Sequence, residues 1–378
     1  MSRKSRRNEV PAHLRVPAAE QLMIDALPDL SGPRVLSMTL GRGQFAVAAA
    51  RDASRQVTLH EFDIYLAEQA RQFIDEELGE GRGALQWESL VAPYPTDRPG
   101  EIRIQCAADF AEEEFDVAAI PVDPRGEAEL TRELLQTAYL RLRTGGRLCA
   151  ATSNNEDQWL HDELRKLFPK VTRRPERTGV VYLATKEGPL KKEKQFSDEF
   201  AFRDRDRLIK AISRPGVFNH RRLDGGARAL INTMQVGEGF RILDLGCGSG
   251  TVALAAAFAA PHVQVVAIDS HARAIACTKQ GAAMNGLENV KTILNAEGDT
   301  GEPGTFDLVL GNPPYYSDYR IAGIFLGAAR RALRPGGTVL IVSKAAEWYV
   351  ENMPVMFPTF KRHIHKLYSV FESTTAGP

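Results

Sequence analysis

The chain has 378 residues, more than one ordinary hydrophobic core accommodates, so we expect two domains of roughly 150–200 residues each. Its 48 basic and 48 acidic residues give a formal net charge of zero at pH 7 and an isoelectric point of about 7.1. This balance excludes a global electrostatic field that would attract nucleic acid, so any such contact must be a local patch.

The cysteine content and hydropathy indicate where the protein works. The four cysteines show neither paired nor zinc-type spacing, and the chain begins without an apolar leader. We therefore expect a cytoplasmic protein with reduced thiols and no metal site. No apolar run approaches the roughly 20 residues that span a bilayer, so we expect a soluble protein without membrane contact. We also expect a monomer.

The chain repeats itself, because four blocks of its first half recur in the same order in its second half. "RVLSMTLGRGQFAVAAA" from Arg34 matches "RILDLGCGSGTVALAAA" from Arg241, 207 residues later, without a gap. "FDVAAIPVDP" matches "FDLVLGNPPY" and "LRTGGRLCAAT" matches "LRPGGTVLIVS", both 191 residues later. In the fourth block "LFPKV" resembles "MFPTF", and an apolar strand follows each. The blocks predict a tandem duplication.

Each copy alternates short Val, Ile and Leu runs with helical segments such as "HARAIACTKQGAAMNG". This alternation predicts βαβ units and, in each copy, a parallel sheet covered by helices on both faces. The predicted fold class is α/β, with two tandem doubly wound, Rossmann-like domains. We place a basic disordered tail at residues 1–10, the first domain at residues 11–188 and the second at residues 214–378.

The first copy is expected to be degenerate. Thr39 and Leu40 replace the first two residues of the glycine turn in the second copy, so side chains fill space that a cofactor needs. Val122 stands in the segment where the second copy has Asn-Pro-Pro. Three surviving residues leave residual cofactor binding open, namely Gly41, Gly43 and Glu61.

Residues 189–213 between the two copies are rich in alternating charge and poor in core residues. The stretch "KEGPLKKEKQFSDEFAFRDRDRLIKAIS" therefore predicts a charged linker that leads into a solvated helix.

The second copy carries a strand, a glycine turn and a helix start in "RILDLGCGSGTVALAAA". Glycines let the backbone approach a ligand closely, and a helix start offers free N–H groups to an anion. The next strand ends 19 residues past the last glycine, at an acid placed to bind both ribose hydroxyls. The pattern predicts an adenosine-containing cofactor, and NAD and S-adenosylmethionine both remain open. The predicted cofactor residues are Asp244, Gly246, Gly248, Gly250 and Asp269.

The strand "FDLVLG" ends in "NPPYYSD". Pro313 and Pro314 forbid further sheet pairing and an immediate helix, so the backbone is stiff where Asn312 and Tyr315 project. An "NPPY" after the fourth strand resembles the amino-methyltransferases, which use S-adenosylmethionine to methylate exocyclic or amide nitrogen. The resemblance implies that the Asn312 side-chain oxygen and the Pro313 carbonyl each accept one N–H of the target amine. Tyr315 then supplies a stacking face.

The segment "RPGVFNHRRLDGGARALINTM", Arg214 to Met234, precedes the glycine turn. Together with the duplication, it is similar to the bacterial ribosomal RNA guanine-N2 methyltransferases of the RsmC and RlmG kind. In that family a degenerate methyltransferase domain precedes an active one, so we expect a structural or RNA-positioning role for the first copy. The resemblance implies methyl transfer from S-adenosylmethionine to guanine N2, with ribosomal RNA or a ribosomal subunit as the partner. It also implies that three further residues belong to the cofactor pocket, namely Phe218, Asp224 and Gly226.

Several points stay open. After the third strand, Asn295 and Glu297 are both candidates for the contact with the adenine amino group. The family usually has Ser where this chain has Asn219, and often Phe and His where it has Tyr315 and Tyr316. Adenine-N6 transfer, protein glutamine-N5 transfer and a non-enzymatic RNA-binding assembly factor therefore remain alternatives. The expected contacts with the RNA backbone are Lys191, Lys192, Lys194, Arg221, Arg222, Arg320, Lys361 and Arg362.

Overall fold

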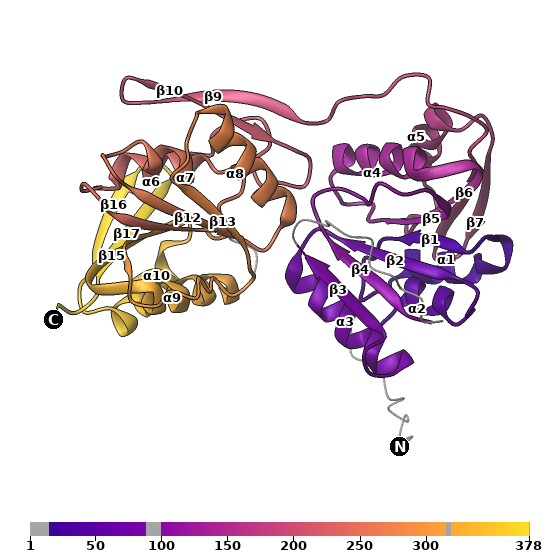
Figure 1. Cartoon of the computed structure of the whole chain (residues 1–378), viewed down its shortest axis with the longest axis horizontal. Coiled ribbons are helices and arrows are strands. Elements are labelled where there is room, and N and C mark those ends of the chain that lie inside the picture. Colours follow the sequence, from indigo (N-terminus) through magenta and orange to yellow (C-terminus); the bar gives the residue numbers. More distant parts are fainter. Residues whose placement is uncertain (1–14, 88–99, 315–318, 378) are drawn as a thin grey trace, which may run out of the picture. The chain divides into compact units, whose positions relative to one another are not determined.

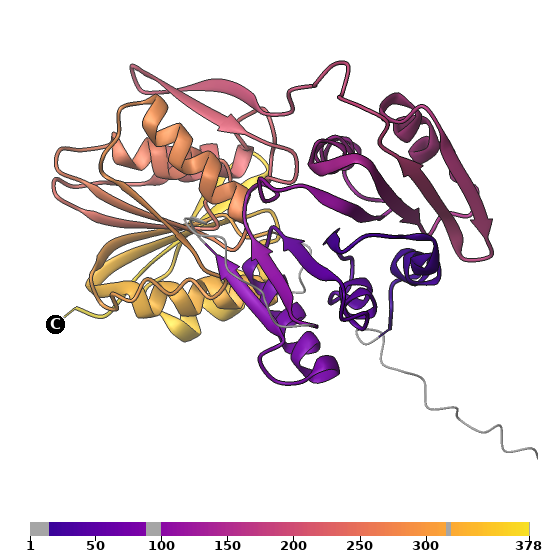
Figure 2. The same ribbon diagram turned by 45° about the vertical axis from the view of Figure 1, so that its right-hand side comes forward.

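This computed structural model describes residues 15–87, 100–314 and 319–377. The chain divides into two compact units, with the main boundary between Gln195 and Phe196; the short segment Asp63–Tyr65 is grouped with the second unit. Each unit contains a twisted sheet between two layers of helices (Figures 1 and 2). None of the described helices is long and apolar enough to cross a membrane. The predicted tail at residues 1–10 lies outside the described part of the chain.

Unit 1 contains an eight-stranded sheet with the strand order β3-β4-β2-β1-β5-β6-β8-β7. Its strands are β1 (Arg34–Ser37), β2 (Gln56–Glu61), β3 (Gly83–Trp87), β4 (Ile102–Cys106), β5 (Phe115–Val122), β6 (Leu142–Thr152), β7 (Val171–Glu176) and β8 (Gly179–Thr185). Its helices are α1 (Ala18–Asp25), the short 3-10 helix η2 (Leu27–Asp29), α2 (Gln44–Ala50), α3 (Ile64–Leu78), α4 (Ala128–Arg141) and α5 (Trp159–Leu167).

Unit 2 contains a seven-stranded sheet with the strand order β13-β12-β11-β14-β15-β17-β16. Its strands are β11 (Arg241–Leu245), β12 (Gln264–Asp269), β13 (Val290–Leu294), β14 (Phe306–Gly311), β15 (Leu333–Ser343), β16 (Lys361–His365) and β17 (Tyr368–Thr374). One face is covered by α6 (Gly225–Thr233), α7 (Thr251–Ala257) and α8 (Ala272–Met284), and the other by α9 (Arg320–Ala332) and α10 (Ala346–Met356) (Figure 1).

The predicted fold class, two tandem doubly wound α/β domains, is confirmed. The central strands of both sheets run parallel, and β5 of unit 1 is buried along its whole length. The prediction of a parallel sheet fails at one edge of each unit, where β8 runs antiparallel to β6 and β7, and β17 runs antiparallel to β15 and β16. The reason is the connection, since two residues separate β7 from β8 and β16 from β17. So short a link permits only a hairpin.

The duplication extends to individual contacts. In unit 1 the Asp116 carboxylate accepts a hydrogen bond from the Arg34 N–H (2.9 Å) and pairs with Arg143. In unit 2 the equivalent carboxylate, Asp307, accepts from the Arg241 N–H (2.7 Å) and pairs with an arginine at the start of β15. The same polar contact therefore joins β1 to β5 in unit 1 and β11 to β14 in unit 2.

The expectation of a solvated helix within residues 189–213 is wrong, because β9 (Asp198–Asp204) and β10 (Arg207–Ser213) form an antiparallel hairpin. Apolar residues occur at every second position here, and the side chains of Phe202, Ile209 and Ala211 are buried. A period of two is typical of a half-buried strand. The charges that alternate with these residues indicate the exposed face of a strand.

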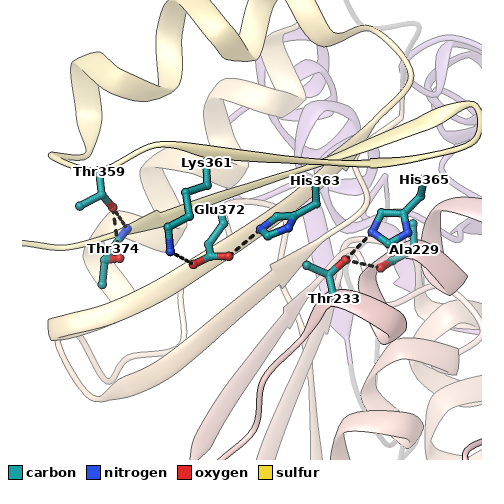
Figure 3. Close-up of polar contacts among 8 residues, drawn as sticks. All are labelled: Ala229, Thr233, Thr359, Lys361, His363, His365, Glu372 and Thr374. Carbon is teal, nitrogen blue, oxygen red and sulfur yellow. Dashed lines mark hydrogen bonds and ion pairs between the residues drawn. The ribbon is translucent and has the colours of Figure 1, made fainter.

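Polar side chains fasten the edge strand β16 to the rest of unit 2 (Figure 3). Glu372 of β17 bonds His363 (2.7 Å) and forms an ion pair with Lys361 (3.3 Å). The Thr233 hydroxyl donates its hydrogen to a carbonyl within α6, so His365 Nε2–H must donate to Thr233 Oγ1 (2.8 Å). This last bond ties β16 to α6, the helix whose opposite end carries residues of the candidate site.

Candidate active site

The site begins where β11 and β14 end side by side. The two strands pair in parallel, with Leu245 opposite Gly311. The next residues are Gly246, which opens the glycine turn, and Asn312, which opens the Asn-Pro-Pro segment. Chain connections leave β11 and β14 in opposite directions across the sheet, and open α/β sheets bind ligands at such a point. Sheet register alone therefore brings the two motifs together.

An open pocket of about 400 Å³ lies at this edge of the sheet. Six of the predicted residues line it, namely Phe218, Asp224, Asp244, Gly246, Gly248 and Asn312. Sequence reasoning overlooked Ser249 and Thr251, which also line it and whose place inside the glycine turn was the available signal.

The three glycines of the turn have different reasons to be glycine. All three have positive φ angles, between 56° and 79°. A Cβ on Gly246 would lie 2.8 Å from the Phe325 ring, and a Cβ on Gly250 would lie 2.8 Å from the Thr278 hydroxyl. A Cβ on Gly248 would meet nothing within 4 Å. Packing therefore excludes side chains at Gly246 and Gly250, whereas Gly248 turns its bare backbone toward open space.

Asp269 holds this turn from the end of β12. Its carboxylate accepts hydrogen bonds from the Gly248 N–H (2.9 Å) and from the His271 N–H (2.9 Å). Desolvation raises the pKa of Asp269 to about 6, and the two N–H groups oppose that shift. Asp269 does not line the pocket directly, so its predicted ribose contact stays a prediction.

Asp244 is a second carboxyl group at the base of the pocket and is 2% exposed. It accepts a hydrogen bond from the Ala253 N–H (3.0 Å). Desolvation, with a smaller contribution from the charge of Asp269, raises the pKa of Asp244 to about 8. Burial therefore favours the protonated form of Asp244, and a protonated carboxyl can donate a hydrogen bond as well as accept one.

Asn312 is held to the start of α6. Its Nδ2 donates to Asp224 Oδ2 (2.9 Å), and the same oxygen accepts from the Gly226 N–H (2.8 Å) and the Ala227 N–H (3.2 Å). Pro313 is buried behind Asn312 and Pro314 is partly buried. The predicted stacking residue Tyr315 lies outside the described part of the chain.

The segment before α6 bends sharply over the pocket. Asn219 has φ 58°, a left-handed conformation that asparagine tolerates better than most residues, and its Nδ2 donates to the Arg222 carbonyl (2.8 Å). The departure from the family's Ser at this position thus has a local conformational basis. Phe218 is 54% exposed at the pocket rim. An aromatic side chain so exposed is available for contact with a ligand.

The loop after β13 separates the two candidates for the adenine contact. Asn295 N–H donates to the Asp269 carbonyl (3.0 Å), so Asn295 lies next to the predicted ribose carboxylate. Its side-chain oxygen accepts from the Glu297 N–H (2.8 Å), while the Glu297 residue is exposed. This arrangement favours Asn295.

Unit 1 fills the corresponding position with its own side chain. Glu20 of α1 is fully buried, and its carboxylate reaches into the first-copy turn. It accepts four hydrogen bonds, from the Thr39 hydroxyl and from the backbone N–H groups of Leu40 (2.7 Å), Gly41 (2.8 Å) and Phe45 (3.3 Å). The residue equivalent to Glu20, 207 positions later, is Ala227, which lines the pocket of unit 2. This internal carboxylate weighs against the residual cofactor binding that the sequence left open.

The described residues contain no cluster of three or more His, Cys, Asp or Glu side chains that could hold a metal ion.

The fold and pocket define unit 2 as a doubly wound α/β domain with a nucleotide-type turn, and residues 209–371 match the family model of the methyltransferase small domain. The chain is similar to ribosomal RNA small subunit methyltransferase C of Pseudomonas entomophila (33% identity over 144 residues) and of Pseudoalteromonas translucida (32% over 160 residues). These alignments cover 37% and 41% of this chain and 43% and 46% of the relatives. The chain therefore spans less than half the length of these curated relatives.

A solved structure matches both units. It is the T. thermophilus 16S rRNA N2 G1207 methyltransferase, RsmC, in complex with AdoMet and guanosine. The match has a TM-score of 0.74 at 21% identity and covers 96% of this chain and 93% of that one. It confirms the tandem two-domain fold. The relatives above confirm the predicted resemblance to ribosomal RNA methyltransferases of the RsmC kind over unit 2.

Glu20→Ala is expected to destabilise unit 1 by about 2–5 kcal/mol, because several buried N–H donors lose their acceptor together. Urea unfolding of the full chain measures the effect on the transition of this unit. Gln21→Ala changes the neighbouring, exposed residue of the same helix and serves as the control. If the two variants unfold alike, the carboxylate does not hold the turn.

Asp244→Asn is expected to change how stability depends on pH. A raised pKa in the folded state means that wild-type stability from this group is complete below about pH 4 and is lost as the pH rises to about 8. Asparagine does not titrate, so the melting temperature of the variant should rise relative to that of the wild type as the pH increases from about 4 to about 8. Thermal melts from pH 4 to pH 9 test this, and parallel profiles would contradict it.

Proposed function

We propose that this protein is an S-adenosylmethionine-dependent methyltransferase that modifies the exocyclic N2 of guanine in ribosomal RNA. One observation carries the proposal: the bare backbone of Gly248 and the carboxamide of Asn312 line the same pocket. A methyl donor and an acceptor amine need adjacent binding positions of this kind. The match of residues 209–371 to the methyltransferase small domain supports the reaction class, and the named relatives support the substrate.

The pocket residues fit S-adenosylmethionine. Gly248 leaves room for close backbone approach, Asp269 ends the strand that follows the turn, and Asp244 supplies a carboxyl group at the base. When bound, this cofactor supplies an electrophilic methyl group on a sulfonium. Asp269 would bind the ribose hydroxyls, and Phe218 would cover the site from the rim.

Asn312 and Pro313 would orient the amine. An exocyclic guanine amine delocalises its lone pair into the ring and is a poor nucleophile. If the Asn312 oxygen and the Pro313 carbonyl each accept one N–H, the lone pair is fixed toward the methyl group. Each bond adds about 1 kcal/mol net, and correct alignment can add several kcal/mol more. The methylated ammonium is a strong acid, so no general base is needed before transfer.

Ribosomal RNA or a ribosomal subunit in the cytoplasm would be the partner. A guanine inside folded RNA must be exposed, at a cost of a few kcal/mol. Backbone contacts from basic residues would offset this cost. Lys191, Lys192 and Lys194 are exposed, whereas Arg221 pairs with Asp198 (2.6 Å). To contact the RNA backbone, Arg221 would therefore have to leave the Asp198 carboxylate and bind a phosphate.

The test is transfer of radiolabel from S-adenosylmethionine to total RNA and to ribosomal particles, followed by digestion to nucleosides. N2-methylguanosine is the expected product. Label in N6-methyladenosine or in protein glutamine would contradict the guanine assignment. Cofactor binding without transfer to any of these substrates would favour the assembly-factor alternative.

Asn312→Ala should leave cofactor affinity within a few-fold while lowering methyl transfer by about 10²–10³, as expected for loss of one preorganised polar contact. Asn352→Ala, the same substitution within α10, serves as the control and should transfer methyl groups normally. Equal transfer rates for Asn312→Ala and the wild type would refute the assigned role.

Cofactor affinity should fall as the pH drops through about 6, because protonation of Asp269 removes the charge that accepts the ribose hydroxyls. Calorimetry between pH 7 and pH 5 should show a loss of up to about tenfold per pH unit below the pKa. Asp269→Asn should bind more weakly at pH 7, by about 1–3 kcal/mol, and with little pH dependence. A flat wild-type profile would exclude this role.

A further inference from the structure

A primary carboxamide has two different ends, and the proposed function requires Asn312 to present its oxygen. Left to rotate, the side chain could equally present its NH₂ group, which would repel a donor amine. The Asn312 Nδ2 donates to Asp224 Oδ2 at 2.9 Å. The same oxygen also accepts from two backbone N–H groups, so it acts as an acceptor. Asp224 therefore binds the nitrogen end of the carboxamide and leaves Oδ1 as the acceptor that Asn312 can offer.

Asp224 is itself held in place by the helix that it caps. The same Oδ2 accepts from the Gly226 N–H (2.8 Å) and the Ala227 N–H (3.2 Å) at the start of α6. The far end of α6 is tied to β16 by the bond between Thr233 and His365 (Figure 3). The carboxylate thus belongs to a helix that is fixed at both ends.

Gly226 makes this arrangement sterically possible. A Cβ at this position would lie 2.8 Å from Asn312 Oδ1 and 2.8 Å from Asp224 Oδ2. Any larger residue would therefore displace one or both side chains. The absence of a side chain at Gly226 leaves room for the Asn312 carboxamide at the start of α6.

The duplicated unit provides an internal comparison. The position equivalent to Asp224, 207 residues earlier, is Pro17, and the position equivalent to Asn312, 191 residues earlier, is Pro121. Strand pairing equivalent to β11 with β14 is kept in unit 1 between β1 and β5. Unit 1 thus retains the frame but has lost both members of the pair, in the domain whose turn is filled by Glu20. Asp224 and Asn312 therefore occur together in the second copy and are replaced together in the first.

We infer that Asp224 is a positioning residue for methyl transfer, one that turns the Asn312 carbonyl oxygen toward the substrate amine; this rests on the proposed function. The resemblance to the family implied a cofactor-pocket role for Asp224. The contacts in this structure also connect Asp224, which lines the pocket, to the Asn312 carboxamide that would receive the acceptor nitrogen.

The test is Asp224→Ser in the full chain. Serine is also a good N-cap, so the start of α6 is retained, but its side chain is too short to reach Asn312. Methyl transfer should fall about 10–100-fold in kcat through misorientation of the acceptor, with cofactor affinity within about threefold of wild type. Asp224→Asn keeps an acceptor oxygen at the same distance and should restore most of the rate.

A double-mutant cycle separates positioning from general damage. In the Asn312→Ala background, Asp224→Ser should lower kcat less than about twofold, since the group that it positions is already gone. Multiplicative losses in the double variant would overturn the inference. A loss of cofactor affinity in Asp224→Ser equal to its loss of kcat would also overturn it.

A separate measurement distinguishes an incorrect substrate assignment from an incorrect role for Asp224. The side-chain NH₂ signal of Asn312 can be followed by NMR in the protein without substrate, and Asp224→Ser should shift it whichever amine is methylated. If the wild type methylates adenine or glutamine rather than guanine, the proposed substrate fails and the same cycle applies to that amine. If the NH₂ signal does not move, or the wild type transfers to no amine, the positioning role is rejected.

Discussion

The parallel pairing of β11 with β14 is the constraint on which the candidate site depends. Leu245 lies opposite Gly311, so the residues that follow, Gly246 and Asn312, leave the sheet next to each other although 66 positions separate them in the chain. Everything that the proposed chemistry requires is then local. A glycine turn brings bare backbone to one wall of the pocket, and a stiff proline segment brings a carboxamide to the other. The neighbouring helices add only the groups that hold these two segments still.

Both copies contain the same arrangement of strand, turn and helix, but the N–H groups of the turn donate to different acceptors in the two copies. A turn of N–H groups at the edge of a parallel sheet needs an acceptor. In unit 1 that acceptor is Glu20, which belongs to the chain itself. In unit 2 the position equivalent to Glu20 is Ala227, and the equivalent N–H groups of Cys247 and Gly248 donate to the Ile268 carbonyl (3.0 Å) and the Asp269 carboxylate (2.9 Å). The acceptors of the turn thus come from helix α1 in unit 1 and from strand β12 in unit 2, where the space beside Ala227 is open.

Much of this was readable from the sequence. The repeat, the doubly wound fold, the glycine turn and the Asn-Pro-Pro segment are all local patterns, and most of the residues predicted from them line one pocket or support it. The hairpin at residues 198–213 is not predicted, because alternating charge fits the exposed side of either a helix or a strand. The burial of Phe202 and Ile209 distinguishes the two, and that burial is known only from the folded structure. Glu20 and the bond from Asp224 to Asn312 could not be predicted, because each joins segments far apart in the chain whose contact exists only after folding.

The buried carboxylate of Glu20 always occupies the acceptor position beside the turn of unit 1. A tethered group has a local concentration far above that of any metabolite, so free anions in the cell do not compete with it. The turn of unit 1 therefore keeps its acceptor whether or not a free ligand is present. The first copy closes its turn with a carboxylate of its own chain, whereas the turn of the second copy borders an open pocket.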